Sequence, residues 1–551
     1  MNLKTFVAVV VLTQGCATLH NGRHQEIRVV TDPAGALLGG AGFGIDALTG
    51  AMWQLEPAKV ELKLAPNLVV AGYGNLPEPP PAGGAGGERP NVVVVLVDDL
   101  RFDELHAGGH PYLETPNMDR LAAEGALFVN SFHAVPLCSP NRATLLTGQF
   151  PSRHGIIDNI ARDLASHHLE TFNLPMKAAG YRTAFLGKWH MGNDPTPRPG
   201  WDYWVAMPGQ GHTTDPELFE DGVLHKVPGY TTDLLTDRAV SFIQREHGLP
   251  FLLYLAHKAV HPDVVQRDDG SLDPESDRGY IPAARHEGRY RDRVFTRRQL
   301  PSEIAADLAG KPAIREALAK LPTAAGPGPG EHEHAAYPWT GEETIRRRAE
   351  MILAVDESLG RIIATLDSLK LLDKTVIILS SDNGFFFGEH GLTTERRLPY
   401  EESIRNPLLM RYPPRIPAGV RPEGLALTVD LAPTVLDLAG VPISPSIQGR
   451  SLVPLFQGTL AGWRQAVLVE FYTNEQPFPH LMDMDYRAIR TGRYKYIHWI
   501  KHPDQDELYD LQSDPLERHN LANDPALAPV KASLRADLGK LVLEAMGLPA
   551  R

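Results

Sequence analysis

Cysteine is scarce in this chain of 551 residues, which contains only Cys16 and Cys138. Two cysteines cannot build a disulfide framework, so a disulfide-stapled scaffold is excluded. Positive charge is also in deficit, because 54 Lys and Arg stand against 67 Asp and Glu, for a formal net charge of −13. This balance argues against nucleic acid as a partner, whereas a local basic pocket for an anionic substrate remains compatible with it.

Apolar runs long enough to cross a membrane are lacking as well. Near the start of the chain, Lys4 is followed by a short apolar run over residues 6–12, which is typical of a secretory signal covering residues 1–16. Gly15-Cys16 resembles a bacterial lipoprotein cleavage site, which would put a lipid anchor on Cys16; ordinary cleavage near Ala17 is the alternative. We therefore expect an exported protein, periplasmic or attached to the outer membrane of a bacterium.

Composition changes along the chain predict its organisation. Residues 17–75 are expected to form a small segment similar to those of bacterial envelope lipoproteins, and residues 76–90 (LPEPPPAGGAGGERP) form a Pro/Gly linker. A catalytic domain is expected over residues 91–465 and a C-terminal subdomain over residues 466–551. The charged stretch 265–340 predicts a long surface insertion that takes part in substrate selection.

Three continuous apolar runs predict strands that are buried on both faces: Asn91–Val97, Phe251–Leu255 and Thr375–Leu379. A helix with an apolar face is expected over residues 345–369. The pattern predicts an α/β fold, in which a large mixed, mostly parallel sheet lies between helices and carries its site at one edge. Short alternating strands after residue 470 add a small C-terminal antiparallel sheet.

Acidic side chains follow two of these predicted strands. Asp98 and Asp99 follow the first, and Asp382 and Asn383 follow the third. Converging carboxylates repel one another by several kcal/mol unless they are neutralised. Oxygen donors select hard ions, so calcium or magnesium is expected rather than zinc. The alternative is that Asp98-Asp99 only caps a helix or turn.

The segment 138–148, CSPNRATLLTG, closely resembles the signature of the type I sulfatases of the alkaline phosphatase superfamily. In that family the cysteine is oxidised to formylglycine. The resemblance covers residues 90–521 through five motifs in the family's order. It implies an alkaline phosphatase-like fold, hydrolysis of sulfate esters, a formylglycine at position 138 and a maturation enzyme that generates it. It also implies a divalent ion, usually calcium, with magnesium as the alternative, and these ligands: Asp98, Asp99, Asp382, Asn383 and the modified Cys138.

The cysteine motif and one further motif supply cationic side chains. If Cys138 begins a helix, Arg142 lies one turn later and over residue 138. The segment Gly187-Lys188-Trp189-His190 matches the family's G-K-W-H, in which the lysine grips sulfate and the histidine contacts the nucleophile hydroxyl. On an extended segment Lys188 and His190 face the same side. A surface lysine and a core histidine are the alternative.

The segment 257–261, HKAVH, follows the second predicted strand. The resemblance gives His261 the role of protonating the departing oxygen, which suits a side chain with a pKa near neutrality. His257 and Lys258 are expected substrate contacts, with a supporting role for His257 and a solvated Lys258 as alternatives. Where the family usually has a sulfate-binding lysine, this chain has Arg396, with Arg397 as the second choice.

The expected reaction is attack of the formylglycine hydrate on sulfur, with Asp382 taking its proton. His261, Lys188 and Arg396 neutralise the leaving oxygen, and His190 acts as the base that releases sulfate. The HKAVH segment and the basic stretch 285–290 look like those of glycan-acting sulfatases, including N-acetylglucosamine-6-sulfatases, so the expected substrate is a sulfated small molecule or glycan. Two alternatives remain: a phosphonate or phosphate ester hydrolase with the same nucleophile, and a non-catalytic envelope binding lipoprotein.

Overall fold

The computed structural model describes residues 89–245, 248–295, 298–320, 341–392, 396–473 and 481–549. The predicted signal at 1–16 with its lipid site Cys16, the small segment at 17–75 and the linker as far as residue 88 lie outside the described residues. Within the described ranges, no helix has both the length and the apolar character that a membrane span requires.

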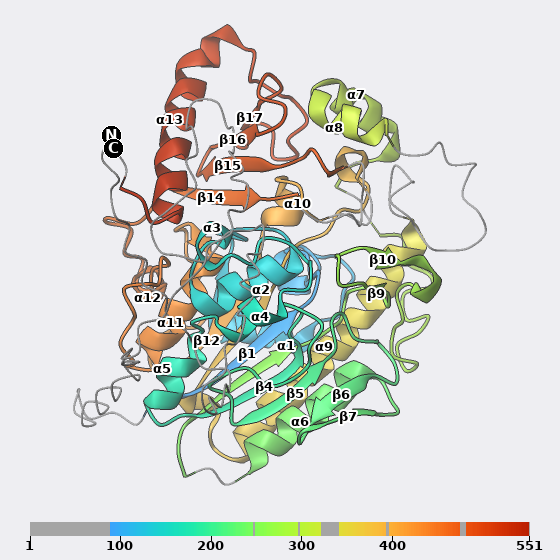
Figure 1. The fold of residues 1–551 in the computed structure, drawn as a ribbon, viewed down its shortest axis with the longest axis vertical. Helices are drawn as coiled ribbons and strands as arrows, with labels where there is room; N and C mark the ends of the chain where they lie inside the picture. The colour runs from blue at the N-terminus through green and yellow to red at the C-terminus, as the bar shows by residue number, and fades with distance from the viewer. Residues whose placement is uncertain are drawn as a thin grey trace, which may run out of the picture. The chain divides into compact units, whose positions relative to one another are not determined.

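A nine-stranded mixed sheet forms the centre of the described chain (Figure 1). Its strands, in spatial order, are β2 (Ala126–Phe128), β12 (Leu408–Arg411), β11 (Thr375–Ser381), β1 (Asn91–Val97), β8 (Phe251–Ala256), β4 (Arg182–Lys188), β5 (Tyr203–Met207), β6 (Glu217–Glu220) and β7 (Val223–Lys226). The strands from β11 to β5 run parallel, and the outer strands are added by antiparallel pairing. The three strands predicted from apolar runs are β1, β8 and β11, which are neighbours, so the mostly parallel sheet is confirmed.

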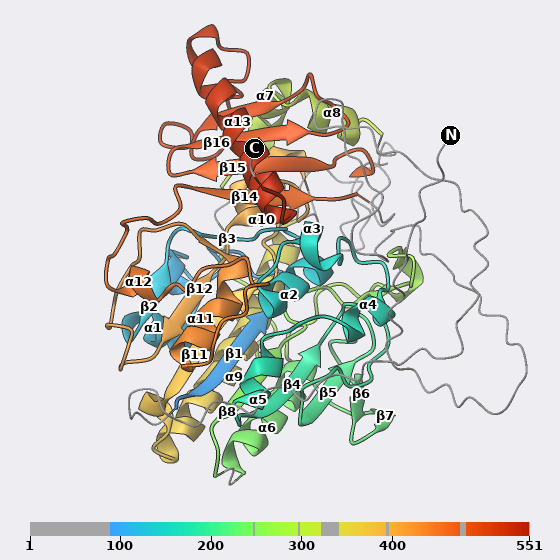
Figure 2. The ribbon, with the colours of Figure 1, turned by 60° about the vertical axis from the view of Figure 1, so that its left-hand side comes forward.

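Helices cover both faces of this sheet (Figure 2). Successive residues of β1 enter different cores, with Val93 in one hydrophobic cluster and Val94 in the other, as expected for a strand buried on both faces. One layer contains α1 (Pro116–Ala123), α6 (Thr231–Gln244) and α9 (Glu342–Ser368); the other contains α2 (Cys138–Thr147), α5 (Asn173–Ala178), α11 (Leu431–Leu438) and α12 (Val453–Phe456). Helix α9 matches the helix predicted over 345–369.

A second, four-stranded antiparallel sheet follows the first, as predicted. Its order is β14 (Ala466–Phe471), β15 (Tyr486–Thr491), β16 (Tyr494–Trp499) and β17 (Glu507–Asp510). Helix α13 (Ala528–Ala545) packs Leu534 and Leu538 against this sheet in a hydrophobic cluster of its own.

The predicted surface insertion at 265–340 is only partly at the surface. In its described part, Tyr280 and Tyr290 are buried in the same core as α9. Helices α7 (Ile304–Ala309) and α8 (Pro312–Leu318) follow, and Ile314 is buried in the cluster that includes the C-terminal sheet. The prediction of a surface segment is wrong for these residues, because apolar side chains spaced among the charges anchor it to two cores.

Candidate functional site

The carboxyl ends of β1 and β11 bring four oxygen-bearing side chains together. The two strands pair in parallel along their whole length, so the residues that follow them meet at one edge of the sheet. The Asp99 N–H donates to Asp382 Oδ1 at 3.1 Å, and Asn383 Nδ2 donates to Asp99 Oδ1 at 2.6 Å. All three side chains and that of Asp98 are fully buried. These four residues therefore lie close together, as their positions after the two strands predicted.

Cys138 is the first residue of α2, and its side chain is fully buried. Its Sγ and one carboxylate oxygen each of Asp98 and Asp382 all lie within 4.8 Å of one another. Burial, which outweighs the opposite effect of Arg396, raises the pKa of the Cys138 thiol to about 12. The unmodified thiol is therefore protonated at neutral pH and is a poor nucleophile.

Arg142 lies one turn into α2, as predicted, but its guanidinium contacts carboxylates. Its Nε donates to Asp382 Oδ2 at 2.9 Å, and its second terminal nitrogen lies 3.5 Å from Asp98 Oδ2. The side chain of Asn141, for which no role was expected, donates to the main-chain carbonyl of Asp382 at 2.5 Å. Helix α2 is thus tied to the ends of β1 and β11, and Arg142 is linked to Cys138 through the two aspartates.

Lys188 and His190 follow the predicted motif but not the predicted geometry. Lys188 is the last residue of β4, and its buried Nζ contacts Asp98 Oδ2. His190 has a φ of 59°, in the left-handed region, so the prediction of an extended segment through this residue is wrong. The ring lies beside Ser139, with Nδ1 3.4 Å from Ser139 Oγ.

Gln266, which sequence reasoning missed, fixes the protonation of His190. Its Oε1 lies 2.9 Å from His190 Nε2, and its own Nε2 donates to the Gly270 carbonyl at 2.7 Å. The second bond turns Oε1 toward the histidine, so His190 Nε2 carries the hydrogen and Nδ1 is the free acceptor. Gln266 lies in the insertion and belongs to no motif, so no sequence signal pointed to it.

Arg396 and His261 complete the cluster around Cys138. One terminal nitrogen of Arg396 lies 3.6 Å from Cys138 Sγ and donates to His261 Nε2 at 2.9 Å, while the other is 3.2 Å from Asp99 Oδ2. His261 Nδ1 donates to the carbonyl of the proline that follows it, at 2.8 Å, so Nε2 is the acceptor and the ring is neutral. Of the two arginines that the sequence left open, the structure brings Arg396 to the cysteine, whereas Arg397 has its carbonyl bound by the C-terminal sheet.

His257 and Lys258, the other expected substrate contacts, have partners within the fold. His257 Nε2 lies 3.1 Å from Ser358 Oγ on α9, and the ring is fully buried. Lys258 Nζ donates to the Pro262 carbonyl at 2.9 Å. The structure does not bring His257 to Cys138, because strand β8 directs this side chain toward the helical layer.

The three buried carboxylates of the site differ in proton affinity. Burial and the neighbouring charge of Asp98 raise the pKa of Asp382 to about 7. Burial also raises the pKa of Asp99. Although burial opposes it, Lys188 and Arg142 hold the pKa of Asp98 well below its usual range. A proton on Asp382 or a cation bound in this cluster relieves the repulsion between the carboxylates.

The donor set fits a hard divalent cation. Asp98 Oδ1 and Asn383 Oδ1 are buried and accept no hydrogen bond. A buried acceptor without a partner is destabilising by about 1–3 kcal/mol. Carboxylate and amide oxygens are the ligands that calcium and magnesium prefer, so these orphan oxygens are accounted for if such an ion binds between the two strand ends.

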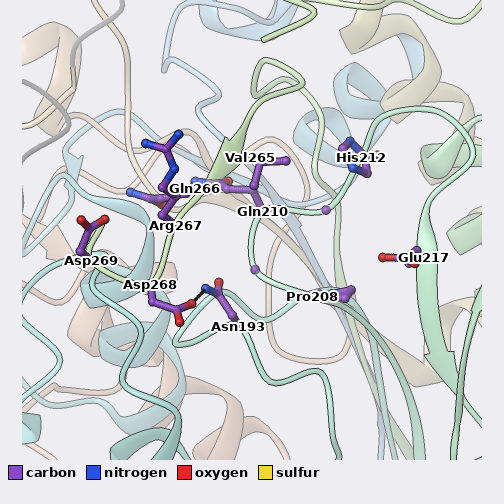
Figure 3. A pocket seen from close by; sticks show the side chains of 12 residues that line it. Asn193, Pro208, Gln210, His212, Glu217, Val265, Gln266, Arg267, Asp268 and Asp269 are labelled. Carbon is purple, nitrogen blue, oxygen red and sulfur yellow. Dashed lines mark hydrogen bonds between the residues drawn. The ribbon is translucent and has the colours of Figure 1, made fainter. Parts of the chain in front are cut away.

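A cavity of about 700 Å³ opens at the same edge of the sheet, and we refer to it as the side cavity (Figure 3). The loops that follow β4, β5 and β8 form most of its wall, which shares Gln266 with the cluster around His190. Figure 3 shows Asp268 and Asp269 on one side of it and His212 and Glu217 on the other.

Comparison with known proteins identifies the family. A family model described as sulfatase matches residues 90–441, and one described as N-sulphoglucosamine sulphohydrolase, C-terminal, matches residues 388–544. An N-acetylglucosamine-6-O-sulfatase of Bacteroides thetaiotaomicron is 32% identical over 489 residues, which cover 79% of this chain and 83% of that protein. A choline-sulfatase of Rhizobium meliloti is 30% identical over 484 residues, covering 81% of this chain and 85% of that protein.

The fold comparison agrees with the sequence comparison. A solved structure of a protein in complex with its substrate D-glucosamine-2-N,6-O-disulfate aligns with a TM-score of 0.70 and 30% identity, covering 84% of this chain and 98% of the other. The sulfatase model alone spans more than half of the chain and includes Cys138 and the ends of β1 and β11. The alkaline phosphatase-like fold predicted from the motifs is therefore confirmed, and the chain belongs to the sulfatase family of sulfuric ester hydrolases.

Proposed function

We propose that this sulfatase removes sulfate from a sulfated carbohydrate, using a formylglycine made from Cys138 and a divalent cation. The proposal rests on the group formed by Cys138 Sγ and the carboxylates of Asp98 and Asp382 within 4.8 Å, with Arg396 at 3.6 Å from the same sulfur. A nucleophile position, hard oxygen donors and a fixed positive charge are thus combined in one buried cluster.

The cation would be held by Asp98, Asp99, Asp382, Asn383 and the modified Cys138, and the donor set supports calcium, with magnesium as the alternative. When bound, it supplies a Lewis acid and a positive charge beside residue 138. The formylglycine hydrate supplies a geminal diol in place of the thiol. Its formation makes a formylglycine-generating maturation enzyme an expected partner of the newly made chain.

Cationic side chains would bind the sulfate group. Lys188 Nζ and the guanidinium of Arg396 both lie in the cluster, against Asp98 and Asp99 respectively. We assign the sulfate oxygens to Lys188 and Arg396, whose charges complement an anion in a site shielded from water. Arg142 holds Asp382 in place for residue 138.

Three groups would move protons. Asp382 takes the proton of the attacking hydroxyl, His261 Nε2 gives one to the leaving oxygen, and His190 Nδ1 takes one in the step that releases sulfate. Burial and the charge of Lys188 lower the pKa of His261 well below its usual range. A sulfate ester brings negative charge next to Lys188 and Arg396, which favours protonation of His261 when the substrate is bound.

The relatives support a sulfated amino sugar as the substrate, because one is named for N-acetylglucosamine 6-sulfate and another is bound to a glucosamine disulfate. The choline-sulfatase relative makes a small sulfate ester the alternative. We also propose export through the signal at 1–16, with lipid attached to Cys16; mass spectrometry of the mature N-terminus tests this.

The decisive experiment couples the modification to turnover. The protein is produced together with a maturation enzyme, and mass spectrometry reads the peptide that carries residue 138. Hydrolysis of N-acetylglucosamine 6-sulfate, choline sulfate and a phenyl phosphonate is then measured on the same sample. We expect an aldehyde at residue 138 and fastest turnover of the sugar sulfate. Full activity with an intact thiol would refute the nucleophile, faster phosphonate turnover would indicate a phosphonate hydrolase, and no turnover at all would indicate a binding lipoprotein.

A further inference from the structure

The side cavity contains a buried hydrogen-bond acceptor without a partner. Gln210 is only 3% exposed, and its Nε2 donates to Gln266 Oε1 at 2.9 Å. Gln210 lines the cavity, and its Oε1 is buried and accepts no hydrogen bond. Since Gln266 Oε1 also receives the His190 Nε2–H, it can only accept from Gln210, and the Gln210 amide cannot be turned around. The free oxygen therefore needs a donor from a ligand, an O–H or an N–H.

The charged side chains that line the cavity are mostly acidic. Glu217, Asp268 and Asp269 contribute three carboxylates, and Arg267 is the opposing cation among the lining residues. Arg267 is itself 3.2 Å from Asp273 Oδ1, which offsets its charge. A ligand group that carries negative charge is repelled by such a rim, whereas hydroxyl, amide and protonated amine groups are accepted.

The position of the cavity links it to the reaction. His190, Gln266 and Gln210 form one chain of hydrogen bonds, each of 2.9 Å, from the residue beside Ser139 to the cavity wall. The side cavity and the cluster around Cys138 and Arg396 lie at the same edge of the sheet, so this chain of hydrogen bonds joins the cavity to the cluster in which the sulfate is proposed to bind. Its volume of about 700 Å³ lies within the 300–1,000 Å³ typical of small-molecule sites.

We propose that the side cavity binds the sugar that carries the sulfate ester, and that it selects a ring with neutral or amine substituents against one with a second sulfate or a carboxylate. Gln210 is the specificity-determining residue, because its Oε1 accepts a hydrogen bond from a hydroxyl or amide N–H of that sugar. This inference rests on the proposed function and narrows it. The related structure is in complex with a substrate that carries a second sulfate, D-glucosamine-2-N,6-O-disulfate, which is the kind of ring that we expect this cavity to disfavour.

The test uses the matured enzyme and three substrates: N-acetylglucosamine 6-sulfate, glucosamine 2-N,6-O-disulfate and 4-nitrophenyl sulfate, which has no sugar. We expect kcat/KM for the monosulfate to exceed that for the disulfate by about tenfold or more, the effect of one unfavourable charge contact. Gln210→Met keeps the length of the side chain but removes the acceptor together with the Nε2 donor to Gln266. It should lower kcat/KM about tenfold on the monosulfate, mainly through KM, with a smaller loss on 4-nitrophenyl sulfate, whereas loss of the bond to Gln266 alone would affect all three substrates alike.

Charge is tested separately. A triple variant with Glu217→Gln, Asp268→Asn and Asp269→Asn changes exposed side chains and should raise kcat/KM for the disulfate about tenfold relative to the monosulfate. Gln448→Met is the matched control. Gln448 accepts a hydrogen bond from the Phe150 N–H at 2.9 Å and donates one to the Ala545 carbonyl at 2.8 Å. These contacts lie at the start of α3 (Pro151–His154) and the end of α13, not at the cavity. We expect it to lower the melting temperature and leave the substrate ratio unchanged.

Several results would overturn the inference while the enzyme remains a sulfatase. They are a wild type that prefers the disulfate, an unchanged ratio in the triple variant, or an equal loss on all three substrates in Gln210→Met. Failure of the matured wild type on every sulfate ester, 4-nitrophenyl sulfate included, would instead refute the proposed function. The two failures are therefore distinguishable on the same set of measurements.

Discussion

Replacement of Arg396 by methionine is the perturbation that the site predicts in most detail. The guanidinium lies 3.6 Å from Cys138 Sγ, 2.9 Å from His261 Nε2 and 3.2 Å from Asp99 Oδ2. Arg396→Met therefore removes a cation from the sulfate position and, at the same time, the counter-charge of a buried carboxylate. The two effects fall on different measurements, one on activity and one on stability.

The contacts give a magnitude for each effect. A hydrogen bond to a charged group is worth about 1.5–3 kcal/mol, so loss of the sulfate contact should lower kcat/KM by about 10- to 150-fold. Removing one partner of a buried ion pair destabilises by about 3–5 kcal/mol. This loss of stability should be measured without added metal and should be smaller with calcium, because a cation bound at Asp99 replaces the missing charge. Arg396→Lys keeps one charge but cannot span both Asp99 and His261, so we expect a loss of about tenfold.

The assay combines steady-state kinetics on 4-nitrophenyl sulfate with urea unfolding in calcium and in EDTA. Arg397→Met is the matched control, since Arg397 is the neighbouring buried arginine, and its carbonyl accepts a hydrogen bond from the C-terminal sheet. Its folded molecules should retain kcat/KM within about threefold of wild type. The reasoning is refuted if Arg396→Met keeps more than half of the activity, or if calcium leaves its loss of stability unchanged.

Three further perturbations have defined outcomes. Cys138→Ala should keep the far-ultraviolet circular dichroism of the wild type and lose turnover to the detection limit, so measurable turnover would exclude residue 138 as the nucleophile. Burial and a neighbouring carboxylate raise the pKa of Asp382 to about 7. Between about pH 4 and pH 7 the folded metal-free protein therefore holds a proton on Asp382 that the unfolded chain does not hold. Its free energy of unfolding in EDTA should fall as pH rises over this range. Asp382→Asn should flatten that slope, and a rise over the same range in wild type would contradict the assignment. Burial opposes it, but a hydrogen bond to Asp307 and the Glu402 carboxylate 3.5 Å away raise the pKa of His390 to about 9, so this stabilisation is present at about pH 6 and is lost as pH rises through about 9. His390→Leu should lower the free energy of unfolding at pH 6 by about 3–5 kcal/mol, and an equal loss above pH 9, measured by urea unfolding, would argue against a charged histidine.

The centre of the fold and the cluster of carboxylates could be predicted because both follow from local rules. A continuous apolar run such as Asn91–Val97 has few alternatives to a strand buried on both faces, and parallel strands end at one edge. Asp98 and Asp382 therefore had to meet once β1 and β11 were recognised as neighbours. The cysteine motif allowed a helix that begins at Cys138, with Pro140 suited to its first turn, and α2 begins at that residue.

The features that the sequence did not predict have a different physical origin, because each depends on the path of a loop in space. His190 is left-handed at φ 59°, which the residue type does not reveal. Gln266 contacts His190, and Gln210 contacts Gln266. These contacts exist because the loops after β8 and β5, which are far apart in the sequence, lie close together in the fold. Tyr280 is buried although charged residues surround it in the sequence. Sequence periodicity carries no information on such contacts, which tertiary packing decides.

The C-terminal sheet is part of the active site rather than an appendage to it. Tyr486 on β15 donates to the Arg397 carbonyl at 2.9 Å, and Lys495 on β16 donates to the Pro399 carbonyl at 3.0 Å. Ser403, in the short helix α10 (Glu401–Ile404), donates to the Arg396 carbonyl. A long side chain can be aimed at one sulfur atom only if its backbone is fixed, because arginine has about 2 kcal/mol of rotamer entropy to lose. The C-terminal family model begins at residue 388, ahead of this segment, so a single family model spans both Arg396 and the small sheet.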